Sequence, residues 1–116
     1  MTTAETPTVE PRELMLDAEQ VRTRPRRELH PGVTFAILWR QDHDAAGVMW
    51  VDAGAEVPEH VHGNASHHVW IIEGRARVDQ RTLGPGSYLH VPPGVPHGME
   101  GLSPGGFSMF YLYLHE

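Results

Sequence analysis

Short apolar segments alternate with breaks rich in Gly and Pro along most of the chain. No stretch shows the 3.6-residue apolar period of a long helix. Typical breaks are Gly84-Pro85-Gly86 and Pro92-Pro93-Gly94, and residues 41–47 are expected to form a hairpin loop. The pattern therefore predicts an all-β, antiparallel fold of small-barrel or jelly-roll type, with strands at residues 33–39, 48–52, 69–73, 76–80, 87–91 and 107–114.

The first residues contain little that can fold. Residues 1–13 place Pro7 and Pro11 among Thr and Glu, so we expect a disordered N-terminal tail. Residues 14–16 are the first apolar cluster and are expected to start a short strand or turn that packs on the barrel or on a partner subunit. The rest of this 116-residue chain is long enough for one core, so residues 14–116 are predicted to form a single domain.

The amino-acid composition limits the classes of ligand and partner that the chain can bind. The chain has no Cys, so any metal must be held by nitrogen and oxygen ligands. A formal net charge of -6 provides no broad basic field for phosphates, which argues against nucleic acid. No apolar run approaches the roughly 20 residues of a membrane helix, and the N-terminal residues lack the layout of a secretory signal. We therefore expect no membrane association and a cytoplasmic location.

Histidines gather in residues 54–74, which read GAEVPEHVHGNASHHVWIIEG. His60 and His62 are two residues apart, so on a strand they point to the same face. Alternation along the strand that follows separates His67 from His68. His97 follows a rigid Pro-Gly turn that can bring a distant histidine to a fixed place. Because imidazole is the commonest metal ligand near neutral pH, these residues predict a metal site.

Two motifs within residues 54–97 resemble those of the cupin superfamily. The first motif of that superfamily is Gly, five residues, His-x-His, three or four residues, Glu, six residues and Gly. The second is Gly, five residues, Pro-x-Gly, two residues and His, followed three residues later by Asn. Here the matching positions are Gly54, His60, His62, His67 and Gly74, and then Gly86, Pro92, Gly94 and His97. Two departures stand out: the Glu position holds His67 and the final Asn position holds Gly101.

The resemblance implies a cupin-type jelly-roll β-barrel, also called a double-stranded β-helix, with one bound metal ion. Carried over by position, the ligands are His60, His62, His67 and His97, as in the four-histidine variant of small cupins. An alternative is that His67 only supports a three-histidine metal. Imidazoles accept several ions, so one divalent Fe, Mn, Ni, Cu or Zn ion is expected. Any catalysis would then be centred on the metal.

Strand alternation predicts a mostly apolar pocket beside these ligands. On the last strand, the set Met109, Tyr111 and Tyr113 is an alternative inward face, and for every wall residue simple core packing is an alternative role. Such a pocket suits a small substrate or ligand with an apolar or aromatic body and an oxygen donor. The predicted walls are Met49, Val51, Val69, Ile71, Leu89, Val91, Phe110 and Leu112; His30, His43, His68, His90 and His115 are expected at the surface or an interface.

The opposite sheet face predicts a subunit contact. Trp50 and Trp70 fall there by alternation, together with Val48 and Ile72. An apolar sheet face of this kind usually packs against another sheet or subunit, and the resemblance adds that small cupins commonly form homodimers. A homodimer through this face and the N-terminal segment is therefore expected.

Two functions are consistent with this reading. The first is a metal-dependent enzyme for a small organic substrate, a dioxygenase or related oxidoreductase, because a four-histidine ligand set leaves coordination positions open. The second is a non-catalytic metal- and ligand-binding module with a sensor or regulatory role. The lack of a phosphate-binding arginine set argues against phosphosugar isomerases and nucleotide-sugar epimerases.

Overall fold

The strands of the protein form two antiparallel sheets. A computed structural model describes residues 12–61 and 63–115; most of the predicted tail (residues 1–11), His62 and Glu116 lie outside these ranges. The six-stranded sheet has the order β1-β2-β3-β10-β5-β8, and the four-stranded sheet has the order β4-β9-β6-β7. The elements are α1 (Ala18–Arg22), β1 (Arg27–His30), β2 (Val33–Gln41), β3 (Asp44–Val51), β4 (Glu56–His60), β5 (Ala65–Gly74), β6 (Ala76–Val78), β7 (Arg81–Leu83), β8 (Tyr88–Val91), β9 (His97–Gly101) and β10 (Phe107–His115).

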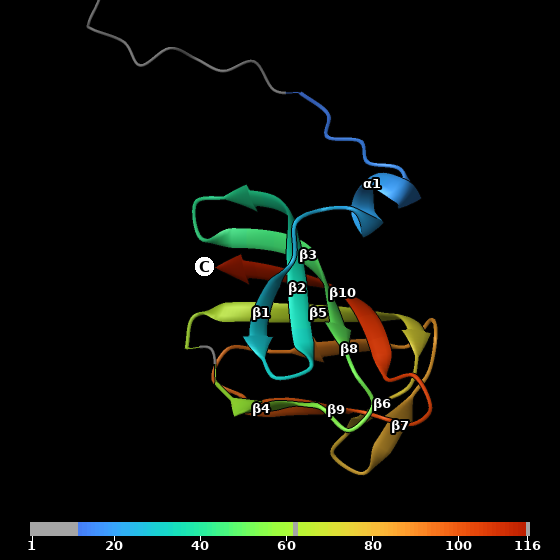
Figure 1. The fold of residues 1–116 in the computed structure, drawn as a ribbon. Coiled ribbons are helices and arrows are strands. Elements are labelled where there is room, and N and C mark those ends of the chain that lie inside the picture. Colours follow the sequence, from blue (N-terminus) through green and yellow to red (C-terminus); the bar gives the residue numbers. More distant parts are fainter. Residues whose placement is uncertain (1–11, 62, 116) are drawn as a thin grey trace, which may run out of the picture.

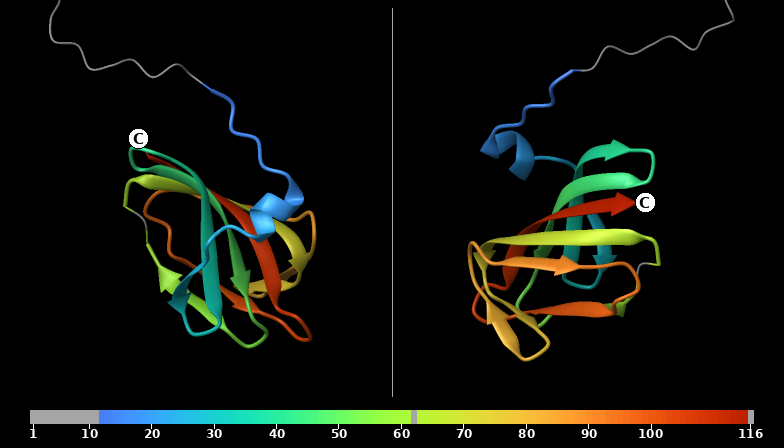
Figure 2. Two further views of the ribbon diagram at one scale, coloured as in Figure 1. Left: turned by 45° about the horizontal axis from the view of Figure 1, so that its top comes forward. Right: turned by 180° about the vertical axis from the view of Figure 1, so that it is seen from behind.

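The two sheets face each other around one core (Figures 1 and 2). Buried side chains from both sheets meet between them; the largest that are fully buried are Met109, Val33, Val51 and Val69. The all-β, antiparallel jelly-roll prediction is confirmed, but the sheets are not closed into a barrel. The described sheets instead leave edge strands, among them β1 and β8 in the larger sheet and β4 in the smaller one.

Every predicted strand is present, and four further strands were missed. These are β1, β4, β7 and β9. Strand β4 reads EVPEH and β9 reads HGMEG, so both contain residues that disfavour strands. They pair with each other, and β9 also pairs with β6, so tertiary pairing outweighs weak local propensity.

The predicted hairpin loop at residues 41–47 is much shorter in the structure. Strand β2 continues to Gln41 and β3 begins at Asp44, which leaves a two-residue turn of Asp42 and His43. Asp42 has a φ of 55°, the left-handed conformation that Asp tolerates in tight turns. Ala45 and Ala46 belong to the strand because they pair with β2 and β10.

Residues 14–16, which were expected to start a short strand or turn, have no regular secondary structure, and the helix α1 follows them. Asp17 caps α1 and exchanges hydrogen bonds with Gln20 in a capping box, which favours a helix start at this point. The helix lies by the outer face of the six-stranded sheet (Figure 2), where a groove is lined by α1, Val48 and Trp50. The Arg26 guanidinium lies 3.5 Å from the centre of the Trp50 ring. In the described ranges, no helix is long and apolar enough to cross a membrane.

Candidate metal centre

Strand β5 presents His67 to the interior and His68 to the outer face. His67 is 3% exposed and lies on the same side as the buried Val69 and Ile71. Trp70, on the other side with His68, is 38% exposed. The alternation predicted for this strand is confirmed, because the two faces of β5 have opposite surroundings, the core and the outside.

Three histidines from three strands meet at one end of the core. His60 ends β4 and His97 begins β9, and the two residues are cross-strand partners with ring centres 4.1 Å apart. His67 reaches them from the opposite sheet: its ring centre is 4.9 Å from that of His97, and its Nδ1 atom is 2.9 Å from His97 Nε2. The structure thus joins parts of the chain that are up to 37 residues apart in sequence (97 − 60).

Hydrogen bonds and stacking orient these rings. His60 Nδ1 lies 2.7 Å from the carbonyl oxygen of Pro58, which can only accept, so Nδ1 carries a proton and donates this hydrogen bond. The His67 ring stacks on Tyr113, with centres 4.2 Å apart and planes 13° apart. A carbonyl acceptor on the second nitrogen is the arrangement that orients a metal-binding histidine.

The spacing of the imidazole nitrogens bears on whether they can bind one ion together. Two nitrogens bound at right angles at about 2.1 Å lie about 3 Å apart, close to the separation of His67 Nδ1 and His97 Nε2. However, no three His, Asp or Glu side chains within residues 12–61 and 63–115 are placed together as a metal site. His62 falls outside the described ranges. Imidazole nitrogens are donors of the type that transition ions bind, and the four-histidine site stays a prediction.

A cavity of about 300 Å³ opens beside the histidines. It lies where the β1 edge of the large sheet approaches β4 of the small sheet, and its walls are largely apolar. Such walls suit an organic ligand of modest size. The lining residues are Leu29, His30, Met49, Val57, Pro58, Glu59, His60, His67, His97, Met99, Met109 and Tyr113.

The predicted pocket walls are only partly right. Met49 lines the cavity as expected. Val51, Val69, Ile71 and Val91 are buried but do not line it, and Leu89 packs against the core.

The favoured inward face of the last strand was wrong. Phe110 and Leu112 are half-buried and lie off the cavity, whereas Met109 and Tyr113 line it. The reason is register: Met109 is the direct partner of Met49 on β3 and Ile71 on β5, so it shares their inward face. Both faces of β10 are apolar, so alternation alone could not choose between them.

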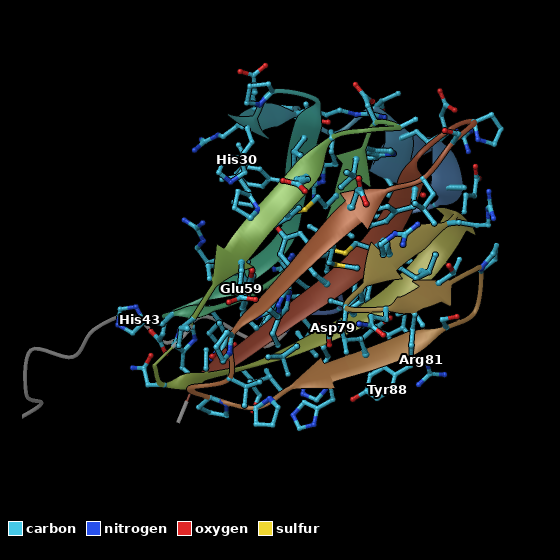
Figure 3. The ribbon with its side chains drawn as sticks, turned by 90° about the horizontal axis from the view of Figure 1, so that it is seen from below. His30, His43, Glu59, Asp79, Arg81 and Tyr88 are labelled. Carbon is cyan, nitrogen blue, oxygen red and sulfur yellow. The ribbon has the colours of Figure 1, made fainter. Side chains whose placement is uncertain are left out.

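Sequence reasoning placed His30 at the surface or an interface, but it lines the cavity. Strand β1 carries His30 and Leu29 to the wall opposite β4 because it pairs antiparallel with β2 at the sheet edge. Glu59, next to His60 on β4, also lines the cavity. In Figure 3, Glu59 lies near the end of β4 and His30 lies to the side of that strand. The only local signal was His-Pro-Gly turn chemistry at residues 30–32, which does not reveal a cavity.

Tyr113 adds a polar group to the cavity wall. Burial, together with the neighbouring Tyr111, raises the pKa of Tyr113 to about 12. Burial also raises the pKa of Tyr111, although Arg40 acts in the opposite direction. Tyr113 therefore keeps its phenol proton near neutral pH, and the hydroxyl remains able to donate a hydrogen bond.

The sheets, the histidine cluster and the cavity together are typical of a cupin. Residues 47–113 match the family described as "Cupin domain", which is more than half of the chain. The chain therefore belongs to the cupin family. A search of curated proteins found no match.

Several solved structures share the fold. An uncharacterised protein with a double-stranded β-helix domain from Klebsiella pneumoniae superposes with a TM-score of 0.74 at 17% identity, covering 90% of this chain and 91% of that chain. An RmlC-like cupin from Shewanella frigidimarina has a TM-score of 0.70 and 25% identity, with coverages of 88% and 90%. A predicted oxalate decarboxylase from Thermotoga maritima has a TM-score of 0.69 and 14% identity, with coverages of 88% and 99%.

Proposed function

We propose that the chain is a metal-dependent oxidoreductase of the dioxygenase type that acts on a small organic molecule. The observation that supports this proposal most directly is the cluster of His60, His67 and His97 on the wall of a largely apolar cavity. With His62, these residues would hold one divalent Fe, Mn, Ni, Cu or Zn ion. When bound, such an ion supplies a redox centre or a Lewis acid.

The cavity walls favour a particular class of substrate. Met49, Met99 and Met109 provide flexible apolar surface that adapts to an irregular or aromatic body. Tyr113 can donate a hydrogen bond to a substrate oxygen, and His30 and Glu59 are cavity-lining groups that can move a proton. A compact enol, diketone or phenol has the apolar body and oxygen donors that this lining accommodates. Apolar walls also limit the number of water molecules beside the reacting groups.

The test begins with elemental analysis of protein purified without added metal. We expect about one equivalent of a transition metal in the wild type and a large loss in His97→Gln. His43→Gln is the matched control, since His43 is an exposed turn residue outside the cavity lining. The metal-loaded wild type and His43→Gln should consume oxygen with at least one member of a panel of enols, diketones and phenols, and His97→Gln should not.

A chelation experiment separates the enzyme from a non-catalytic module. A structural ion should be needed for folding, so its removal by EDTA should lower the melting temperature strongly. A catalytic ion should leave the metal-free sheets folded, with only a modest loss of stability. Stoichiometric metal without oxygen consumption across the panel would contradict the enzyme proposal and favour the sensor or regulatory module.

We also propose a homodimer through the outer face of the six-stranded sheet. Helix α1 covers part of this face near Val48, but Trp70, Ile72 and Tyr88 remain 38%, 45% and 50% exposed. A second copy would remove this apolar surface from water. Light scattering after size-exclusion chromatography should give twice the chain mass for the wild type and the chain mass for Trp70→Ser. A monomeric wild type would contradict the proposal.

A further inference from the structure

A second pair of histidines lies on the outer face of the six-stranded sheet, away from the cavity. His68 on β5 and His90 on β8 are direct cross-strand partners. Their rings are stacked, with centres 4.7 Å apart and planes 11° apart. Strand β8 is at the edge of the sheet and His90 is exposed, so solvent and dissolved ions can reach the pair.

We propose that His68 and His90 form a second metal site, a two-imidazole chelate for a divalent late transition ion such as Cu²⁺ or Zn²⁺. Two nitrogens that bind one ion at about 2.1 Å are at most about 4.2 Å apart. In the stacked arrangement the ring centres are 4.7 Å apart and the nitrogen lone pairs, which lie in the ring planes, do not converge. Binding therefore requires the exposed His90 side chain to rotate until one of its nitrogens and His68 Nε2 point at the same ion. Water molecules complete the coordination, and imidazole donors suit these ions.

Tyr88 prepares His68 for this role. The Tyr88 hydroxyl lies 2.7 Å from His68 Nδ1. When Nδ1–H donates to this oxygen, Nε2 is left with a lone pair for an ion, which is the usual orientation of a metal-binding histidine. The Trp70 ring, 6.2 Å from His68 and tilted by 18°, packs on the same face. Figure 3 shows Tyr88 on the outer side of β8, away from the space between the sheets.

This pair is separate from the cavity histidines. His67 and His68 are adjacent in sequence, but His67 is buried at the cavity and His68 is on the opposite face of the strand. One strand therefore presents histidines to two different environments. The inference does not depend on the proposed cavity site, because it uses none of the residues that line the cavity. In the proposed homodimer it requires that His90, on the edge strand β8, stay open to solvent.

The experiment counts Zn²⁺ bound to the metal-free full-length protein by equilibrium dialysis. At Zn²⁺ concentrations that saturate the wild type, His90→Gln should bind one equivalent fewer. The double variant His68→Gln/His90→Gln should lose no more than His90→Gln alone, because a chelate is lost when either ligand is removed. His43→Gln, which removes an exposed imidazole elsewhere, should bind as much as the wild type. Tyr88→Phe should keep the stoichiometry and bind about tenfold more weakly.

Two results of this experiment would refute the His68–His90 chelate. Unchanged Zn²⁺ stoichiometry in His90→Gln would overturn the proposal. It would also be overturned if the double variant lost the sum of the Zn²⁺ lost by the two single variants, since additive losses mean that the two imidazoles bind independently. A second measurement uses His97→Gln, in which the proposed cavity site is disabled: substoichiometric Cu²⁺ should broaden the NMR signals of the His68 and His90 rings together. Broadening that spares either ring would also refute the chelate.

Discussion

Gly98 connects the backbone of the small sheet to the geometry of the histidine cluster. It lies on β9 between His97 and Met99, and β4 passes close above it. A Cβ atom at this position would lie 2.9 Å from both the Glu59 nitrogen and the Val57 oxygen. Both are backbone atoms of β4, so rotation of a side chain cannot relieve the overlap. Gly98→Ala should therefore push β4, and His60 with it, away from β9.

The size of the effect follows from two opposing terms. Ordinary contact begins near 3.4 Å, so β4 must retreat by about 0.5 Å (3.4 − 2.9). Overpacking of this kind costs about 1–3 kcal/mol. Replacing Gly by Ala where the backbone permits it returns about 0.4–1 kcal/mol by restricting the unfolded chain. Gly98 has no positive φ, so both terms apply, and the net loss in free energy of unfolding should be about 1–2 kcal/mol.

Urea unfolding measures this loss, with Gly105→Ala as the matched control. Gly105 is an exposed loop residue whose added Cβ would meet no atom within 4 Å. The control should stay within about 0.5 kcal/mol of the wild type. Gly98→Ala should also bind Zn²⁺ at the cavity histidines more weakly in a competition assay, because the pairing of His60 and His97 is disturbed. Equal unfolding free energies for the two variants would refute the reasoning about the β4–β9 contact.

Three further predictions concern the core, the cavity wall and the N-terminal segment. Tyr113 has a pKa of about 12 in the folded protein and about 10 in the unfolded chain, so the unfolded state loses the phenol proton first as pH rises. The free energy of unfolding is therefore unaffected by Tyr113 below pH 10 and falls by about 3 kcal/mol as pH rises through 12. The chain has no Lys to titrate in that window, so urea unfolding at several pH values should show this slope in the wild type and in Tyr88→Phe, and a shallower one in Tyr113→Phe. Met109→Ala should cost about 2–5 kcal/mol in urea unfolding, since Met109 is 1% exposed; a loss below 1 kcal/mol would contradict its core role. Arg26→Gln should cost about 0.5–1 kcal/mol and change Trp fluorescence through the lost contact with Trp50, and unchanged emission would count against that contact.

The interior of the fold shows how far alternation can predict. On β5, alternation groups His67 with Val69 and Ile71, and the match of His67 to the cupin motif selects this face as the inward one, which burial confirms. On β10 both faces are apolar, and the face that lines the cavity was predicted wrongly. There the pairing of Met109 with Met49 and Ile71 decides the direction, and that pairing depends on residues distant in sequence.

Some residues of the candidate site could likewise be predicted from the sequence, and others could not. The spacing of histidines in residues 54–97 pointed to a cluster, and the structure brings His60, His67 and His97 together. The sequence did not reveal His30 as a cavity residue, because a turn histidine reaches the cavity only when β1 pairs at the sheet edge beside β4. Nor did it reveal the His68–His90 pair, which requires the register between β5 and β8.

The sequence by itself determined the class of fold and the family, and it pointed to His60, His67 and His97 as a cluster, because these depend on local periodicity, turn residues and fixed spacing. Only the tertiary structure decided which strands pair, which face of β10 points inward, and which further side chains share the cavity. The physical reason is that strand register and sheet order depend on contacts between residues far apart in the chain. A period-two pattern specifies two faces of a strand, and the surrounding strands determine which face meets the core.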